Sequence, residues 1–384
     1  MRRLNHRLHR HRSERNEESP TGDCFVTLFL AMTFLVTSCG LKLFVLAMVG
    51  LLILSGSCTK SKQVDYEYSD FIFGSYVRIK IVAEDSVKTR QAVDKTMQTL
   101  KHIDSIASIF NPQSEVSILN KSGKAEMSSD LREIITKSIE VSDKSNGAFD
   151  ITVGPAMKKW GFYDTNQMNL FTTNDTNKTN ATNKRKALYK NIRAIRGIRA
   201  ISGNLFQDSV IGYQKIRIKD DSIFLKTGMA IDLGGIAVGY AVDKVCQMLK
   251  SEGIKDGLID AGGEIVVFGD KTYKIGIKNP KGEGIVNTIV LKNQAISTSG
   301  NYEKFFEKDD KKYCHIINPK TGQAIADTLN TLCSVTIIAD KCVDADAYAT
   351  AVFVLGLEDG QKLIHTLGYK GILITNDGKM IEVK

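Results

Sequence analysis

Two side chains near the C-terminus have the types and spacing for metal chemistry. Asp346 and Thr350 lie in the segment DADAYAT, residues 344–350. Helical residues four apart lie on one face, so this carboxylate and hydroxyl would point the same way. With a nearby carbonyl and phosphate oxygens, they would form the oxygen-only site that Mg²⁺ prefers. The pair also fits a helix-start charge and an exposed hydroxyl, and both interpretations stay open on spacing alone.

Turns built from glycine and small residues supply further candidates. GAFD (147–150) and TSG (298–300) are predicted to be tight turns, and IDLGGIA (231–237) leads into a predicted helix. The free N–H groups and positive dipole end of such a helix can face a phosphate. Asp150 and Asp232 in these turns could also serve as turn caps.

Several common signatures are absent from the sequence. No GxGxxG follows a strand, and neither GxxxxGK[ST] nor HExxH occurs, so Rossmann, P-loop and zincin classes have no anchor. The net charge of +9 is spread out. Its densest basic cluster, within 184–199, favours a solvated or partner-docking face over a nucleic-acid stripe. No nucleic-acid partner is therefore expected.

The apolar patterns predict short strands with a few helices between them. Tyr66–Val82 alternates as strands do, and Leu258–Phe268 and Ile151–Val153 are also strand-like. Helical spacing appears in 85–110, 128–147, 237–251 and 345–357, and further strands fit 273–277, 285–291, 332–339 and 372–375. Strands outnumber helices and rarely alternate with them one for one, which favours an α+β fold over a doubly wound one.

The first residues form a targeting signal. Two uncharged apolar runs end in small residues before Cys39 and Cys58, as in a lipoprotein signal whose cysteine is acylated. We expect a leader at 1–58, whose start codon is over-assigned, with lipid on Cys58 and Cys39 as the alternative. A tether (59–65) and a domain (66–384) follow, with a flexible Asn/Thr-rich insertion at about 165–200. The protein would be anchored to a membrane in the bacterial cell envelope, facing the periplasm or exterior.

Four cysteines follow the predicted leader. They show neither a CxxC pair nor a Cys/His metal spacing, which argues against a metal centre built on them. We expect them to be buried small apolar residues: Cys246, Cys314, Cys333 and Cys342.

Nine segments form a collinear pattern: FGSYVRI (73–79), FNPQSEVSILN (110–120), GAFDITVGP (147–155), KWGF (159–162), IDLGGIAVGYAVD (231–243), DAGGEI (260–265), ISTSGNYEKFF (296–306), HIINPKTG (315–322) and DADAYATAVFVLG (344–356). Together they resemble the FAD:protein FMN transferases of the ApbE-like family. The resemblance implies largely antiparallel sheets packed with helices. It also implies a Mg²⁺-dependent enzyme that attaches FMN from FAD, through a phosphoester bond, to a Thr or Ser of an exported acceptor protein with a flavinylation motif, releasing AMP.

The resemblance also assigns roles to single residues. It implies that Asp346, Thr350 and the backbone carbonyl of Gly235 bind Mg²⁺, and His315 and Asp346 are the candidates for the catalytic base. Contacts to the flavin nucleotide are implied at Phe73, Phe110, Ala148, Phe149, Asp150, Asp232, Val238, Thr298, Ser299 and His315.

The chain departs from the family pattern at three positions. Val238 stands where the family usually has Lys, and Glu264 and Asn318 replace the more usual Asp. Two other functions therefore stay open: a surface lipoprotein that binds FAD without transferring it, and a Mg²⁺-dependent FAD pyrophosphatase in which water replaces the acceptor hydroxyl.

Overall fold

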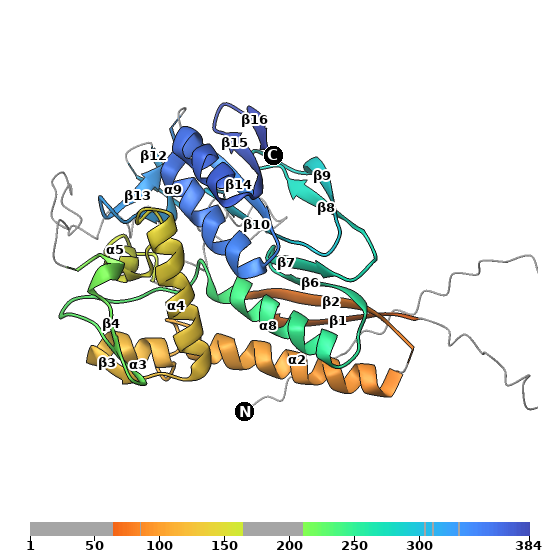
Figure 1. The fold of residues 1–384 in the computed structure, drawn as a ribbon. Helices are drawn as coiled ribbons and strands as arrows, with labels where there is room; N and C mark the ends of the chain where they lie inside the picture. The colour runs from red at the N-terminus through yellow and green to blue at the C-terminus, as the bar shows by residue number, and fades with distance from the viewer. Residues whose placement is uncertain (1–63, 85, 164–209, 303–304, 309–310, 329–330) are drawn as a thin grey trace, which may run out of the picture. The chain divides into compact units, whose positions relative to one another are not determined.

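The computed structural model describes residues 64–84, 86–163, 210–302, 305–308, 311–328 and 331–384. The predicted leader, most of the predicted tether and the predicted insertion lie outside these residues. Contacts within the chain separate Met1–Asp65 from a compact unit, Tyr66–Lys384. All described helices, and all described strands except the start of the first, lie in this second unit (Figure 1).

An eight-stranded sheet forms the centre of the unit, with the strand order β1-β2-β6-β7-β10-β14-β15-β16. The registers from β2 to β16 are all antiparallel. This arrangement of antiparallel strands and separate helices confirms the predicted α+β class. The strands are β1 (Val64–Ile72), β2 (Ser75–Ala83), β6 (Asp256–Ala261), β7 (Ile265–Phe268), β10 (Ala295–Gly300), β14 (Leu332–Ala339), β15 (Lys370–Thr375) and β16 (Met380–Val383).

The two faces of this sheet are covered differently. Helices α2 (Ser86–Ala107), α8 (Ala237–Ser251) and α9 (Cys342–Leu367) pack on one face, where Val335 and Ile337 of β14 join the main core. Ile338 points to the other face, which packs against the hairpin of β8 (Tyr273–Lys278) and β9 (Ile285–Leu291). Successive strand residues alternate between faces, so β14 serves two cores.

Smaller elements complete the unit. The helices are α3 (Glu115–Ser122), α4 (Ser129–Lys144), α5 (Gly154–Lys159) and the 3₁₀ turns η1 (Ile151–Val153) and η2 (Tyr213–Lys215). Two three-stranded sheets contain β3 (Lys124–Glu126), β4 (Arg217–Lys219) and β5 (Ser222–Phe224), and β11 (Phe305–Lys308), β12 (Lys311–Asn318) and β13 (Gln323–Ala326).

Two of the predicted strands are wrong in detail. Ile151–Val153 is a 3₁₀ turn, because the Asp150 carboxylate accepts the Thr152 N–H and closes the chain locally. Leu258–Phe268 is interrupted at Gly262 and Gly263, whose φ angles of 84° and 116° suit glycine and produce the turn between β6 and β7.

Other expectations are confirmed. The four cysteines after the predicted leader are buried and unpaired. Helix α8 and strand β14 have the predicted bounds, whereas α9 continues past a non-helical Gly356 to Leu367. No helix in the described ranges combines the length and the apolar character that a bilayer crossing needs.

Candidate active site

Asp346 is a buried carboxylate in the first turns of α9, with 5% of its surface exposed. Its Oδ2 accepts the Gly239 N–H of α8 at 3.0 Å. Burial raises the pKa of Asp346 above its usual value; the Gly239 N–H opposes this, and the nearby Asp243 carboxylate adds to it. Among the described residues, no lysine or arginine contributes to this pKa. The charge on Asp346 therefore lacks a basic partner there.

Asp344, two residues earlier, points to the other side of α9 and has such a partner. The Lys137 ammonium of α4 lies 2.8 Å from Asp344 Oδ1. Burial works to lower the pKa of Lys137, but the hydrogen bond and charge of Asp344 raise it overall. The protein thus compensates one carboxylate of this turn internally and leaves the other for a cation from outside.

Thr350 lies one turn beyond Asp346, where segments distant in sequence meet. Its Oγ1 is 3.2 Å from Ser299 Oγ of β10. A Cβ placed on Gly235 would lie 3.2 Å from Thr350 Oγ1 and 3.4 Å from Phe149 Cε2. Glycine therefore lets the backbone before α8 approach both residues. The structure brings together Gly235, Ser299, Thr350 and Phe149, which the family resemblance assigns to one site.

This donor set fits a hard divalent cation. A carboxylate, a hydroxyl and a backbone carbonyl are oxygen ligands of the kind that Mg²⁺ takes, with substrate phosphates completing the coordination. A buried carboxylate with no basic neighbour is also costly unless a cation compensates it. Within the described ranges there is no cluster of three or more His, Cys, Asp or Glu residues suited to a metal, so any Mg²⁺ there would need these mixed oxygen donors.

Asn120 of α3 holds the loop before α8 by two hydrogen bonds to Ile231. Its amide donates to the Ile231 carbonyl at 2.8 Å and accepts the Ile231 N–H at 2.7 Å. Asp232 then closes an Asx turn by accepting the Gly234 N–H at 2.8 Å. Sequence reasoning missed Asn120, although it is the last residue of the quoted segment 110–120.

Tyr163 is a second residue that sequence reasoning missed. Its hydroxyl donates to Asp232 Oδ2 at 2.7 Å, and its ring packs edge-on against Phe110 at 6.2 Å. Burial, with the Asp232 charge and hydrogen bond, raises the pKa of Tyr163 far above its usual value. Phe110 stays 48% exposed, so one aromatic side chain is presented to solvent beside Tyr163. The sequence feature that could have identified Tyr163 is its position directly after the quoted segment KWGF.

Both carboxylate oxygens of Asp150 accept hydrogen bonds from within the protein. Oδ1 accepts from the Thr152 N–H and hydroxyl at 2.8 and 2.6 Å, and Oδ2 accepts the Tyr213 N–H at 2.9 Å. Burial raises its pKa although these hydrogen bonds oppose the shift. Asp150 therefore links the segment after α4 to η2, beside buried Ala148. Its contact with the nucleotide stays a prediction.

Phe73 forms the turn between β1 and β2 together with Gly74. Their φ angles are 58° and 72°, and such a left-handed conformation is unusual for phenylalanine. The Phe73 N–H donates to Asp104 Oδ2 of α2 at 3.2 Å, which fixes the turn against that helix. Strain of this kind accumulates at functional sites. The contact of Phe73 with the nucleotide stays a prediction.

The other predicted residues occupy different positions. Thr298 and Ser299 lie in strand β10 and not in the predicted turn, so their side chains point to opposite faces of the sheet. The Thr298 hydroxyl lies 2.8 Å from that of Thr336. His315 lies half-buried on β12, in a sheet that packs against α9. Val238, in the first turn of α8, is half-buried against the main core. Their contacts with the nucleotide, and the catalytic role of His315, stay predictions.

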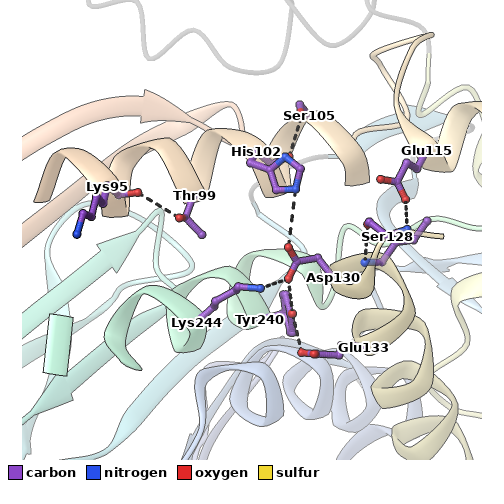
Figure 2. Close-up of polar contacts among 11 residues, drawn as sticks. Lys95, Thr99, His102, Ser105, Glu115, Ser128, Asp130, Glu133, Tyr240 and Lys244 are labelled. Carbon is purple, nitrogen blue, oxygen red and sulfur yellow. Dashed lines mark hydrogen bonds and ion pairs between the residues drawn. The ribbon is translucent and has the colours of Figure 1, made fainter. Parts of the chain in front are cut away.

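A polar cluster behind the site fixes α8 to α4 and α2. Tyr240 and Lys244 of α8 both donate to Asp130 at the start of α4, and Tyr240 also contacts Glu133 at 2.7 Å (Figure 2). His102 of α2 lies 3.8 Å from the other Asp130 oxygen. Burial opposes ionisation of Asp130, but Lys244 and Tyr240 lower its pKa below the usual value. This cluster therefore holds three helices of the scaffold together.

Comparison with known proteins identifies the family of the chain. The sequence profile of the ApbE family matches residues 73–373. The chain belongs to the ApbE family. An FAD:protein FMN transferase of Klebsiella pneumoniae is 29% identical over 80% of this chain and 83% of its own length. One from Vibrio cholerae is 28% identical over 86% and 94%.

Solved structures of the family have the same fold. The ApbE protein of Thermotoga maritima, 28% identical, aligns with a TM-score of 0.67 over 83% of this chain and 97% of its own. The flavinyl transferase ApbE of Pseudomonas stutzeri in its apo form, 25% identical, aligns with a TM-score of 0.68 over 84% and 95%. The chain is therefore an enzyme of the transferase class.

Proposed function

We propose that this chain transfers FMN from FAD to a threonine or serine hydroxyl of an exported acceptor protein and releases AMP. Mg²⁺ would be held by Asp346, Thr350 and the Gly235 carbonyl. The observation that carries the proposal is the buried Asp346 carboxylate, which has no basic partner among the described residues and lies in the same site region as Thr350 and Gly235. The names of the relatives support the choice of FAD and of a protein acceptor.

In the proposed reaction, the acceptor hydroxyl oxygen attacks the phosphorus of the FMN half. A new O–P ester bond forms as the bond from this phosphorus to the bridging oxygen breaks. The electron pair leaves with AMP, and the hydroxyl proton passes to a base or to water. Bound Mg²⁺ would supply charge neutralisation at the pyrophosphate oxygens.

The chain's own groups would bind and orient the nucleotide. Among the described residues, no oxygen accepts the Val238 N–H, so this first-turn donor of α8 is available to a phosphate. The exposed Phe110 ring could stack on the flavin, with Tyr163 holding it from the side. His315 or Asp346 would accept the hydroxyl proton. Such a general base contributes less to the rate when the transition state of phosphoryl transfer is loose.

The test is incubation of the full chain with FAD, Mg²⁺ and a protein bearing a flavinylation motif. Covalent flavin fluorescence on the acceptor in a denaturing gel, with release of AMP, is the expected result. AMP without labelled acceptor would instead identify an FAD pyrophosphatase. Omission of Mg²⁺ and an acceptor whose Thr is changed to Ala are the controls.

Val238 gives a specific reason to consider FAD binding without transfer. The family usually has a lysine there, and its absence removes one cationic contact to the nucleotide. A chain that retains FAD but yields neither AMP nor labelled acceptor in the same incubation would be a binding protein.

We also propose that the protein is lipid-anchored through Cys58 in the bacterial cell envelope, facing the periplasm or exterior. The support is the apolar run that ends at Ser57 in the sequence. Cys58→Ser should release the protein from the membrane fraction. Mass spectrometry of the mature N-terminus checks this. Lipid on Cys39 instead would change the lipidated residue, but the protein would still be a lipoprotein.

A further inference from the structure

Helices α8 and α9 are connected by hydrogen bonds that run in both directions. The Asp243 carboxylate of α8 accepts the Cys342 N–H at 2.8 Å and the Val343 N–H at 2.9 Å, one on each oxygen. One turn earlier on α8, the Gly239 N–H donates to Asp346. Each helix therefore supplies acceptors for backbone donors of the other.

Asp243 replaces a cap that α9 lacks. The residue at the N-cap position, Lys341, makes no side-chain capping bond. The first N–H groups of a helix have no partner within it, and an anion at that end also interacts favourably with the helix dipole. Cys342 is fully buried, so without Asp243 its N–H would lack both water and a protein acceptor.

The two backbones approach so closely at this point that the geometry has little freedom. A Cβ on Gly239 would lie 2.6 Å from the Cys342 carbonyl oxygen and 2.8 Å from Asp346 Cβ. Cys342, Asp346 and Thr350 follow one another at single-turn intervals on α9. Fixing the start of α9 against α8 therefore also fixes both predicted metal ligands.

Asp243 also contributes charge. Its carboxylate accepts from the two residues that open α9, one turn before Asp346, so two negative charges lie close together there. A neutral capping residue would avoid this repulsion. A second negative charge near Asp346 disfavours the apo site and favours occupancy by a divalent cation.

We propose that Asp243 is a positioning residue for the metal site, which holds Asp346 and Thr350 at the N-terminus of α8 and so sets the affinity for Mg²⁺ without touching the metal. This inference rests on the proposed function. It assigns to Asp243 the role of holding the N-terminus of α9, which carries the two predicted metal ligands.

The test measures metal binding directly. Mn²⁺, whose free EPR signal disappears on binding, is titrated as a stand-in for Mg²⁺ into the full chain with and without FAD. Asp243→Asn keeps the shape of the side chain and should weaken Mn²⁺ binding by about tenfold to a hundredfold, the usual range for groups behind metal ligands. Asp243→Ala should weaken it further, so that Asn gives partial rescue.

Cys342→Pro changes the donor of the same hydrogen bond instead of the acceptor. It removes one donor to Asp243 and leaves the carboxylate in place. Proline is tolerated at the first position of a helix, and the extended Lys341 (ψ 141°) suits a residue before proline. We expect weaker Mn²⁺ binding here as well, so the proposal remains testable even where Asp243→Asn fails to fold.

Ser128→Ala is the matched control. Ser128 caps α4 by accepting the Leu131 N–H, and its loss removes a helix cap away from the metal ligands. It should lower stability but leave Mn²⁺ affinity within about twofold, well below the tenfold expected of a group behind the ligands. Unchanged Mn²⁺ affinity in Asp243→Asn and Cys342→Pro would overturn the proposal, provided that Asp346→Asn abolishes binding. If Asp346→Asn also binds normally, the metal site of the proposed function has failed as well.

Discussion

Asp130 and Asp346 are both buried carboxylates that contact α8, but the protein treats their charges in opposite ways. Lys244 and Tyr240 surround Asp130 and lower its pKa despite burial. Asp346 receives one N–H from Gly239, and burial raises its pKa. A buried charge is tolerated when it is compensated. The carboxylate compensated within the protein therefore serves the fold, and the other one is suited to a bound cation.

The largest expected effect comes from removing the uncompensated charge. Asp346→Asn should lower Mg²⁺-dependent turnover by on the order of 10³-fold or more, because a ligand to a catalytic metal is worth several kcal/mol. Stability without Mg²⁺ should stay equal or rise, since a buried charge disappears while an oxygen remains for Gly239. Urea unfolding and turnover assays check both, and near-normal turnover would refute the metal site.

The reverse pattern is expected for Asp130→Asn. The change leaves Lys244 without its charged partner, and hydrogen bonds to charged groups are worth about 1.5 to 3 kcal/mol. The free energy of unfolding should fall by about 2 kcal/mol within that range, while Mn²⁺ affinity changes little. A variant that loses metal affinity as strongly as Asp346→Asn would show that the two carboxylates are not functionally distinct.

Val238→Lys tests whether the N-terminus of α8 also accepts external charge. A cation there would meet the phosphate oxygens of FAD, and a charge-assisted contact should increase FAD affinity by about tenfold. Fluorescence titration at equal Mg²⁺ measures it. Because Val238 is half-buried against the main core, unchanged or weaker binding would mean that it belongs to the scaffold.

The smallest effect concerns pH. The pKa of Asp130 is lowered on folding, so its contribution to stability is present above the unfolded pKa and is lost as pH falls through the folded value. The stability difference between the wild type and Asp130→Asn should therefore narrow as pH falls from 7 toward 3. The pKa of Asp346 is raised on folding, so its effect on stability has the opposite sign. In the metal-free protein, ionisation of Asp346 should lower the free energy of unfolding as pH rises. Urea unfolding at several pH values distinguishes the two, and a difference that widens toward low pH would contradict this.

Much of the fold was predictable because local pattern and tertiary environment agree. Helix α8 has an apolar face and ends near Gly253, and β14 is a continuous apolar strand covered on both faces. Where a turn interrupts an apolar run, as at Gly262 between β6 and β7, or a side chain closes a local ring, as at Asp150, the pattern alone misled.

The sequence by itself determined the family of the chain. The one-turn spacing of Asp346 and Thr350, the glycine at 235 and the nine collinear segments all lie within short stretches of chain, where local geometry governs. They predicted the family and most of the residues that meet around Thr350.

Only the tertiary structure decided which charges are compensated and by what. Asp344 and Asp346 share one short motif, yet Lys137 pairs with the first. Asp243 caps a helix about 100 positions away, and Tyr163 reaches Asp232 across a long stretch of sequence. Electrostatic compensation acts through space over a few ångströms, and the distances between these partners are set by how α4, α8 and α9 pack, which no local pattern encodes.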